Sequence, residues 1–325
     1  MPPLIESKQR RGQAPLPDLF TFDQIVGTEP EKQSVAFPAG GYYVMRDGWT
    51  ADSNYLLFDC GPHGTNNCGH AHADALSFEL AVNGKTVLID PGTYTYTGSK
   101  EMRYWFRSSE AHNTLTIDNE SSSISAGPFS WKTIARSECS SWITDERFDY
   151  VVGSHDGFMR LAEPAKHTRS ILFIKNGYWM VRDVVETSGA HDLQARFHLA
   201  PGLAPLTLPN NDNMVRVVSE NLDTPVLQIS AFAKNIEWGK ENASVSECYG
   251  EKKEAFVLSI GVLAKGSEEL VVFLLPDGAV VRQIEARAFE IEIAGRRDRL
   301  TLREGKNQPQ IYTDEHGSVC AELTE

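Results

Sequence analysis

Several features that would assign this chain of 325 residues to a class of protein are missing. No apolar run approaches the ~20 residues that a membrane-spanning helix requires, and the most apolar stretch, residues 270–275, has the length of a strand. The first six residues lack the basic and apolar regions of a secretion signal. The sequence therefore predicts no membrane association and carries no signal peptide that would indicate where the protein acts.

Cysteine is scarce, and no two cysteines form a Cys-X-X-Cys pair. An odd number of scattered cysteines describes neither a disulfide framework nor a four-cysteine zinc site. We expect ordinary thiols with at most one bridge, at Cys60, Cys68, Cys139, Cys248 and Cys320.

Positive charge is also in short supply, because 44 acidic residues outnumber 31 basic ones and the net charge is −13. Proteins that bind nucleic acid normally present a basic face, so nucleic acid is not an expected partner. Binding of any other polyanion would have to depend on a local basic cluster rather than on the field of the whole molecule.

A sustained helical period of 3.6 residues is absent, and short strands with turns take its place. Asn83-Gly84 and Asn176-Gly177 each separate two runs of alternating apolar residues, which is the strongest short-range signal of a β-hairpin. Further strands are expected at 256–263, 270–275 and 289–293. The pattern predicts an all-β fold, a large antiparallel two-layer β-sandwich with few short helices.

The chain divides unevenly by composition. Residues 1–34 are polar and proline-containing, which is typical of a linker or the remnant of an upstream region. Residues 35–325 form the predicted β-sandwich domain. A subdivision near residue 201, with a smaller C-terminal β subdomain at 201–325, is a further expectation.

The densest chemistry lies between residues 66 and 113, where four of the nine histidines fall within or just before one run. A His-X-His pair ends at His72, an aspartate (Asp90) closes the next strand, and His112 follows. Imidazole and carboxylate ligands at three protein positions suit zinc. We therefore expect His72, Asp90 and His112 to bind a divalent metal, with a hydrogen-bonded His–Asp pair as the alternative that needs no metal.

The hairpin register constrains this site. A two-residue loop at Asn83-Gly84 pairs Val82 with Lys85, and continuing that register places Asp90 opposite Ser77. His72 would then lie ~16 Å farther along an extended strand, on the opposite face. The metal site therefore requires residues 70–75 to form a turn or bulge instead of a straight strand.

Specific motifs in this chain resemble the heparinase II/III-like polysaccharide lyases. They are the run from Gly69 to Leu80, Asp90-Pro-Gly-Thr-Tyr, the run from Trp105 to Leu115, and the run from His167 to Phe173. The resemblance covers roughly residues 35–200. It implies a C-terminal β-sandwich that follows a helical (α/α) toroid, and that toroid has no counterpart in this chain. Periplasmic or secreted localisation is what the resemblance favours.

The resemblance implies cleavage of a uronic-acid-containing polysaccharide by β-elimination, with the zinc holding the site's shape. His70 matches the histidine that borders the active cleft, and Tyr96 or Tyr104 matches the tyrosine of some members. His72, Asp90 and His112 match the metal ligands. Because the base of the toroid is missing, the chain alone is expected to hold an incomplete catalytic site.

Five further residues complete the predicted site. Arg103 and Arg107 carry guanidinium groups that fit carboxylate or sulfate, although solvated surface charge is nearly as good an interpretation. His63 lies in a glycine-rich loop that would face the cleft. Asp74 and Asn113 adjoin ligands and would orient them, or serve the turn and the local backbone.

Two other functions fit the same residues. A non-catalytic carbohydrate-binding or scaffold domain with a structural zinc needs none of the acid–base groups. A zinc-dependent hydrolase needs an open coordination position and a nearby base, and three protein ligands leave such a position.

Overall fold

The computed structural model describes residues 30, 32–207, 213–221, 223–303, 310–313 and 319–324. The predicted linker at 1–34 lies almost entirely outside the described residues. Chain contacts separate Met1–Lys32 from one compact unit, Gln33–Glu325, and the account below concerns that unit. None of the described helices is long and apolar enough to cross a membrane.

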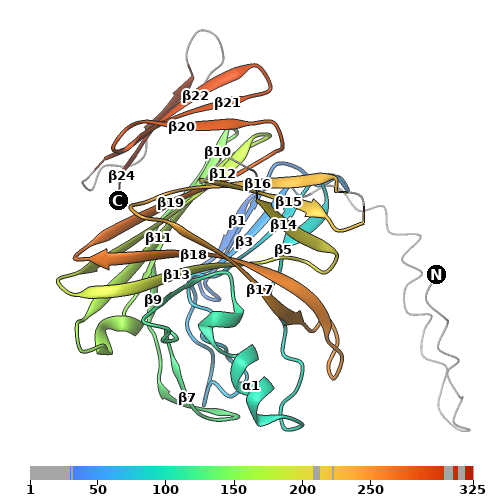
Figure 1. Ribbon diagram of the computed structural model, residues 1–325, viewed down its shortest axis with the longest axis vertical. Helices are drawn as coiled ribbons and strands as arrows, with labels where there is room; N and C mark the ends of the chain where they lie inside the picture. The colour runs from blue at the N-terminus through green and yellow to red at the C-terminus, as the bar shows by residue number, and fades with distance from the viewer. Residues whose placement is uncertain are drawn as a thin grey trace, which may run out of the picture. The chain divides into compact units, whose positions relative to one another are not determined.

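Strands dominate the described part of the chain, as the sequence predicts, and the only helical elements described are short (Figure 1). The helical elements are α1 (Lys100–Phe106), η2 (Ser109–Ala111) and η3 (Gly157–Arg160). The strands are β1 (Val35–Phe37), β2 (Tyr42–Arg46), β3 (Tyr55–Asp59), β4 (Phe78–Val82), β5 (Lys85–Leu88), β6 (Leu115–Ile117), β7 (Ile124–Gly127), β8 (Ser130–Thr133), β9 (Ser137–Thr144), β10 (Phe148–His155), β11 (Ala165–Ile174), β12 (Tyr178–Thr187), β13 (Ala190–His198), β14 (Leu203–Thr207), β15 (Met214–Ser219), β16 (Pro225–Phe232), β17 (Glu237–Val245), β18 (Lys253–Lys265), β19 (Glu268–Leu275), β20 (Val280–Glu285), β21 (Ala288–Ile293), β22 (Arg296–Arg303), β23 (Gln310–Thr313) and β24 (Val319–Thr324).

An eight-stranded antiparallel sheet, in the order β14-β15-β16-β19-β12-β11-β10-β9, is the centre of the fold. One row of cross-strand partners on it, from Val151 through Ile171 and Val181 to Val272, is fully buried. This row belongs to the larger core, which also takes in the sheets β1-β2-β3-β4-β5 and β17-β18-β13-β6. The predicted antiparallel β-sandwich is therefore confirmed.

The opposite face of the central sheet is also apolar, which explains why its strands read as continuous hydrophobic runs. Leu172, Met180 and Phe273 pair across neighbouring strands and belong to a second core with Phe289 and Leu300. That core packs the five-stranded sheet β20-β21-β22-β24-β23, in which the β22–β24 pair is parallel. A third layer is thus added to the sandwich along this face.

The strand pairing differs from the expected subdivision near residue 201. β14, β15, β16 and β19 all follow residue 201, yet they pair within the same sheet as β9–β12. The separate C-terminal sheet begins only at Val280. Cross-strand hydrogen bonding therefore joins strands of 201–275 to the preceding strands.

Both Asn-Gly hairpins form where the sequence predicts them. Asn83 and Gly84 have φ values of 49° and 72°, and Val82 pairs with Lys85 across the loop. At the second hairpin Ile174 pairs with Tyr178, which leaves a three-residue loop. Asparagine and glycine tolerate the left-handed backbone that such turns require.

The predicted pairing of Asp90 with Ser77 is wrong, because a bulge interrupts the β4–β5 register. Ala81 pairs with Thr86, but Leu80 pairs with Leu88, which is one residue out of step. Beyond Leu88 the chain leaves β4, and the amide of Ile89 donates to the carbonyl of His198. The bulge therefore redirects the segment that carries Asp90.

The required bend before β4 is confirmed. No strand is assigned between residues 60 and 77, and β4 begins only at Phe78. The loop turns back through hydrogen bonds from the Ser77 amide to the Asp74 carbonyl and from the Leu76 amide to the Asp59 carbonyl. Residues 70–75 therefore do not continue β4 as a straight strand, while Leu76 and Ser77 remain bonded to Asp59 at the end of β3.

Candidate functional site

The folded loop brings His72 to His112, which lies 40 residues later in the chain. His112 follows η2, and that short helix is tied to the loop because Ser109 Oγ donates to the carbonyl of Ala73. Arg107 adds a bond from Nε to the carbonyl of Ala71. Two segments that are distant in sequence are thus fixed side by side by hydrogen bonds from side chains of one to main-chain carbonyls of the other.

His112 is the centre of the predicted metal site. Its Nε2 atom lies 3.2 Å from Nδ1 of His72 and 3.4 Å from Oδ2 of Asp90. Both imidazoles are buried, whereas the carboxylate of Asp90 is partly exposed. The other carboxylate oxygen of Asp90 accepts a 2.7 Å hydrogen bond from the amide of Gly92, so Oδ2 is the atom turned toward His112.

The hydrogen bonding of His112 assigns its tautomer. Nδ1 lies 2.7 Å from the carbonyl oxygen of Ser108, which can only accept, so Nδ1 carries the proton. Nε2 then faces Asp90 Oδ2 at 3.4 Å, so a favourable contact between the two atoms requires either a proton or a metal ion between them. A carbonyl partner on the outer nitrogen is the usual arrangement of a metal-binding histidine.

The spacing of the donor atoms fits zinc. With bonds of about 2.0–2.1 Å, two ligand atoms of one tetrahedral zinc lie about 3.3–3.4 Å apart. The separations of 3.2 and 3.4 Å around His112 Nε2 agree with that edge length. His72 Nε2 is buried without a hydrogen-bond partner, which further shows that this imidazole is not held by protein groups on both sides. The donor types and these two edges fit zinc, but the group of described residues whose ligand atoms all lie within 4.8 Å of one another does not include Asp90.

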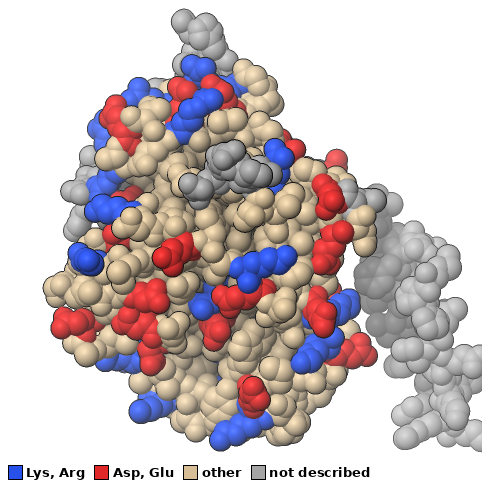
Figure 2. Space-filling view, in the orientation of Figure 1, with Lys and Arg blue, Asp and Glu red and all other residues tan. Residues whose placement is uncertain are grey.

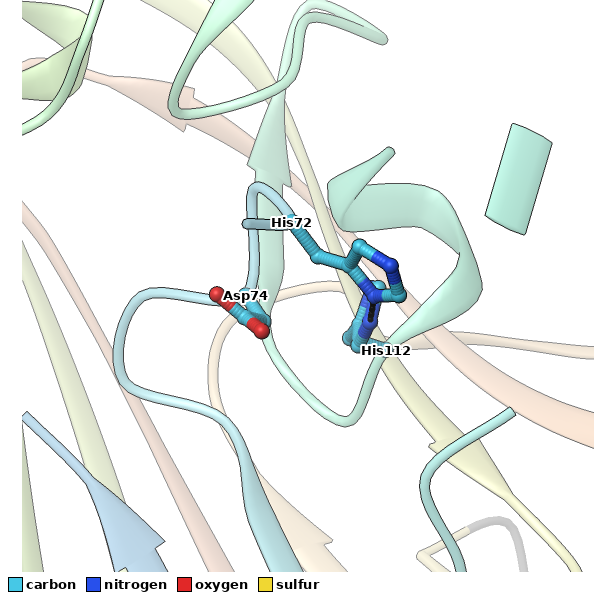
Figure 3. A group of neighbouring side chains, drawn as sticks. All are labelled: His72, Asp74 and His112. Carbon is cyan, nitrogen blue, oxygen red and sulfur yellow. Dashed lines mark hydrogen bonds between the residues drawn. The ribbon is translucent and has the colours of Figure 1, made fainter. Parts of the chain in front are cut away.

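Asp74 also comes within reach of a shared ion. Ligand atoms of His72, Asp74 and His112 all lie within 4.8 Å of one another, and Figure 3 shows the carboxylate beside the paired imidazoles. The sequence offers two roles for Asp74, a carboxylate that orients a ligand histidine or a cap for the turn. In the structure its carboxylate lies within 4.8 Å of ligand atoms of both histidines, whereas Asp90 lies beside His112.

Burial dominates the electrostatics of the site. Desolvation, with the nearby imidazole of His112, lowers the pKa of His72 to about 2. Desolvation also raises the pKa of Asp90, against the opposing effect of His112. A neutral imidazole is the form that binds metal, so burial prepares His72 for that role.

A cleft of about 480 Å³ is lined by five of the eleven predicted site residues, which are His63, His70, His72, Asp74 and Asp90. His70 is exposed, and its ring makes edge contacts with Tyr96 at 5.3 Å and Phe129 at 6.2 Å. His63 is half-buried against Trp131, with a ring separation of 4.3 Å. His70 is therefore the imidazole that a large ligand in the cleft can reach.

Tyr96 and Tyr104 lie in different surroundings. Tyr96 is half-buried and lies within an aromatic group with His70, Phe129 and Tyr249. Tyr104 lies on α1, where Lys100 is 5.8 Å from its ring, and neither tyrosine is among the residues that line the cleft. Of the two alternatives, Tyr96 is the one placed beside His70.

Arg103 and Arg107 are not the surface guanidinium groups that a role in gripping the substrate requires. Each is 1% exposed. Arg103 donates to the carbonyls of Gly69 and Pro128, and Arg107 donates to those of Ala71, Gly127 and Pro128. Both lie behind the loop and hold its backbone, because the planar guanidinium can bridge several carbonyl groups at once.

Asn113 binds main-chain groups rather than a ligand. Its side-chain nitrogen donates to the carbonyls of Phe78 and Ile89, and its oxygen accepts from the amide of His198 at 2.6 Å. It thus fills the gap that opens between β4 and β5 after the bulge. Asn113 fixes the chain that follows His112.

Sequence reasoning missed Asp59 and Tyr42, which come from β3 and β2 and face the same cleft. Burial and the neighbouring Asp74 raise the pKa of Asp59 to about 8. No lysine or arginine occurs among the described residues lining this cleft, although three carboxylates do. An alternating strand gives no signal that its last residue will meet a loop 15 residues away, which is why these two residues were not predicted.

Comparison with known proteins places these observations in a family. The family model described as Heparinase II/III-like, C-terminal matches residues 29–307. The curated heparin-sulfate lyase of Pedobacter heparinus is 26% identical over 274 residues, which are 82% of this chain and 39% of that protein. The heparin-sulfate lyase of Bacteroides stercoris is 24% identical over 254 residues, 76% of this chain and 34% of that protein. The chain therefore spans at most about two fifths of the length of these two relatives.

Solved structures have the same fold. A crystal structure of heparan sulfate lyase from Pedobacter heparinus superposes with a TM-score of 0.70 at 21% identity, covering 86% of this chain and 44% of that one. A crystal structure of heparinase III gives a TM-score of 0.67 at 20% identity, covering 84% of this chain and 43% of that one.

Proposed function

Because this chain belongs to the heparinase II/III-like C-terminal family, we propose that it is the β-sandwich part of a polysaccharide lyase. The substrate we infer is an acidic, uronic-acid-containing polysaccharide, cleaved by β-elimination. The observation that carries the proposal is the position of His70. It is exposed in the cleft two residues from the buried His72, on a loop whose shape the surrounding hydrogen bonds fix.

In this reaction a base removes the C5 proton of the uronic acid, and the electron pair forms the C4–C5 double bond. The C4–O bond breaks, and an acid protonates the leaving oxygen. The C5 proton lies next to a carboxylate, so negative charge that develops there needs a cationic or hydrogen-bonding partner. We assign His70 to proton transfer or to this charge, with Tyr96 packed against its ring as the second candidate for proton transfer.

We propose that His72, Asp90 and His112 hold a zinc ion, with Asp74 within reach of it. When bound, zinc would supply a fixed positive charge that ties the loop to the segments after β5 and η2. The protein's own contribution is the orientation of the donors through the Ser108 carbonyl and the Gly92 amide. We give this metal a structural role, because the loop that it would tie down is the one that carries His70.

We infer that the catalytic site is completed by groups outside this cleft. A polyanion meets three carboxylates there and no lysine or arginine among the described lining residues, so its own carboxylates lack a partner. Acidic and basic side chains are interspersed on the face shown in Figure 2, rather than gathered by sign. The longer relatives leave room for an upstream domain, and a toroid carrying the base is the partner we propose.

Activity on heparan sulfate and on unsulfated uronic polymers tests the lyase. β-Elimination leaves an unsaturated uronide that absorbs in the ultraviolet, a hydrolase leaves none, and a binding module turns nothing over. We expect strong activity from the chain joined to an upstream toroid and weak activity from the chain alone. His70→Gln should lower kcat of the joined protein by about 100- to 10 000-fold. The exposed Lys132→Gln should not lower it. A kcat for His70→Gln within tenfold of the unmodified protein would remove His70 from the mechanism.

Elemental analysis tests the metal independently of activity. We expect one zinc per chain, lost in His72→Ala and Asp90→Ala. The matched control is Asp118→Ala, because Asp118 also pairs with a buried histidine, His191, at 2.7 Å. Retention of zinc in both ligand variants, or its loss in the control, would contradict the ligand assignment.

A further inference from the structure

A row of buried, hydrogen-bonded polar side chains crosses the central sheet beneath the site. The reaction proposed above assigns these side chains no role. His155, His167, Arg169 and Asp183 lie on one face of β10, β11 and β12, where His155 pairs with His167 and Arg169 pairs with Asp183 across the strands. All four side chains are at most 2% exposed. Polar groups buried this deeply are costly unless each one is hydrogen-bonded, so their arrangement calls for a specific account.

The hydrogen bonds run in one direction. The amide of Gly157 donates to Nδ1 of His155, so the proton of that ring is on Nε2, which lies 3.2 Å from Nδ1 of His167. His167 must then carry its proton on Nε2, 2.7 Å from Oδ1 of Asp183. Both imidazoles are thus neutral donors pointing toward one carboxylate, whose charge is balanced by Arg169.

Arg169 donates hydrogen bonds both to Asp183 and to the main chain of the site. Nε and Nη2 bind the two oxygens of Asp183 at 2.7 and 2.9 Å, a bidentate pair. Nη1 donates to the carbonyl of Leu76 at 2.8 Å and to that of Asn113 at 2.7 Å. Leu76 follows Asp74 by two residues, and Asn113 directly follows His112. One guanidinium group therefore joins the two segments that carry the candidate metal ligands.

The backbone of Leu76 shows why such a clamp is needed. Its φ is 62°, in the left-handed region that residues with a branched side chain rarely occupy. Conformations of this kind persist only where surrounding contacts enforce them. Here the Leu76 amide donates to Asp59 and its carbonyl accepts from Arg169, so both sides of the strained residue are held.

We propose that Arg169, held in place by Asp183 and the His155–His167 pair, is a positioning residue that sets the separation of the Asp74 and His112 segments. The proposal rests on the metal site proposed above. It predicts that the arginine governs metal affinity and the rigidity of the loop, beyond its share in the stability of the fold.

The chain provides a matched control. Arg182 lies on the adjacent position of β12, is 2% exposed and pairs with Glu269 at 2.7 Å, but faces the C-terminal sheet on the other side. Arg169→Lys and Arg182→Lys each retain the charge, and a single ammonium group cannot reproduce the fork of an arginine. Asp183→Asn is the second variant, in which the shape of the carboxylate is kept and its charge removed.

Zinc affinity at pH 7.5 is measured by competition with a chromogenic chelator, and the visible spectrum of the Co²⁺-loaded chain reports the ligand geometry. We expect Arg169→Lys and Asp183→Asn to weaken zinc binding by about 10- to 100-fold, the range for partners behind metal ligands, and to alter the cobalt spectrum. Arg182→Lys should stay within threefold of the unmodified chain at a comparable loss of stability. Three results would overturn the proposal. Zinc binding could be weakened equally by Arg169→Lys and Arg182→Lys, or the zinc affinity of folded Arg169→Lys could be unchanged. The third result is that neither Arg169→Lys nor Asp183→Asn folds in saturating zinc.

Hydrogen exchange separates this inference from the metal site itself. If the unmodified chain binds no zinc, the proposed metal site fails, and the exchange rates then decide the positioning role alone. We expect faster amide exchange in peptides covering 70–78 and 108–114 in Arg169→Lys, but not in Arg182→Lys. Unchanged exchange in those peptides would refute the positioning role.

Discussion

Acid should destabilise this fold through its buried histidines, and His155 gives the clearest test. Burial and the neighbouring His167 hold the pKa of His155 well below its usual range. Protonation of Nδ1 would also remove the hydrogen bond from Gly157. In the native state the ring therefore stays neutral at a pH at which the unfolded chain, with a pKa of about 6.5, takes up a proton.

The sign and the size follow from linkage. Where the unfolded state binds more protons, stability rises with pH, so the contribution of His155 is complete above about pH 7.5 and is lost as pH falls through about 6.5. With one proton taken up only on unfolding, the loss between pH 7.5 and 5.5 is about 1.4 kcal/mol. A carboxyl group with a raised pKa, such as Asp59, makes stability rise rather than fall as the pH is lowered. The contribution of His155 is therefore read from the difference in unfolding free energy between the unmodified chain and a His155 variant.

Urea denaturation of the chain and of His155→Gln at both pH values isolates this contribution. Glutamine removes the titrating group, so the stability difference between variant and unmodified chain should shrink by about 1.4 kcal/mol at pH 5.5. Phe158→Leu is the control, because the Phe158 ring lies 5.1 Å from the His155 ring and neither Phe nor Leu titrates. Its loss of stability relative to the unmodified chain should be the same at both pH values. A constant difference for His155→Gln would refute the assignment of a neutral buried imidazole.

Three further predictions concern the site and its support. Asn113→Ala should cost at least about 3 kcal/mol in urea denaturation, because three main-chain groups lose their partner, and a loss below about 1 kcal/mol would contradict this. Gly153→Ala should destabilise by about 1–3 kcal/mol, because its Cβ would lie 2.5 Å from Sγ of Cys60; Cys60→Ala should restore part of the loss. Zinc at about 100 times its Kd should stabilise the chain by about 2.7 kcal/mol, and chelation or His112→Ala should abolish the gain.

Local signals determined most of the fold. Asn83 and Asn176 adopt the left-handed conformation that their hairpins need, and both hairpins were predicted from two adjacent residues. Short apolar runs, alternating in some strands and continuous in those of the central sheet, are separated by turn residues, so the all-β class followed as well. The bend before β4 was also predicted, because a straight strand would have kept His72 away from Asp90.

Tertiary structure alone decided how the site is built. The bulge between Leu80 and Ala81 shifts the register by one residue, and nothing in the local pattern marks it. The burial of Arg103 depends on carbonyl groups some 25 and 34 residues away, and the approach of Asp74 to His112 depends on η2. Residue type and spacing determine turns and strand faces because those are local properties. Which polar groups meet depends on contacts between distant segments, and only the folded chain brings those segments together.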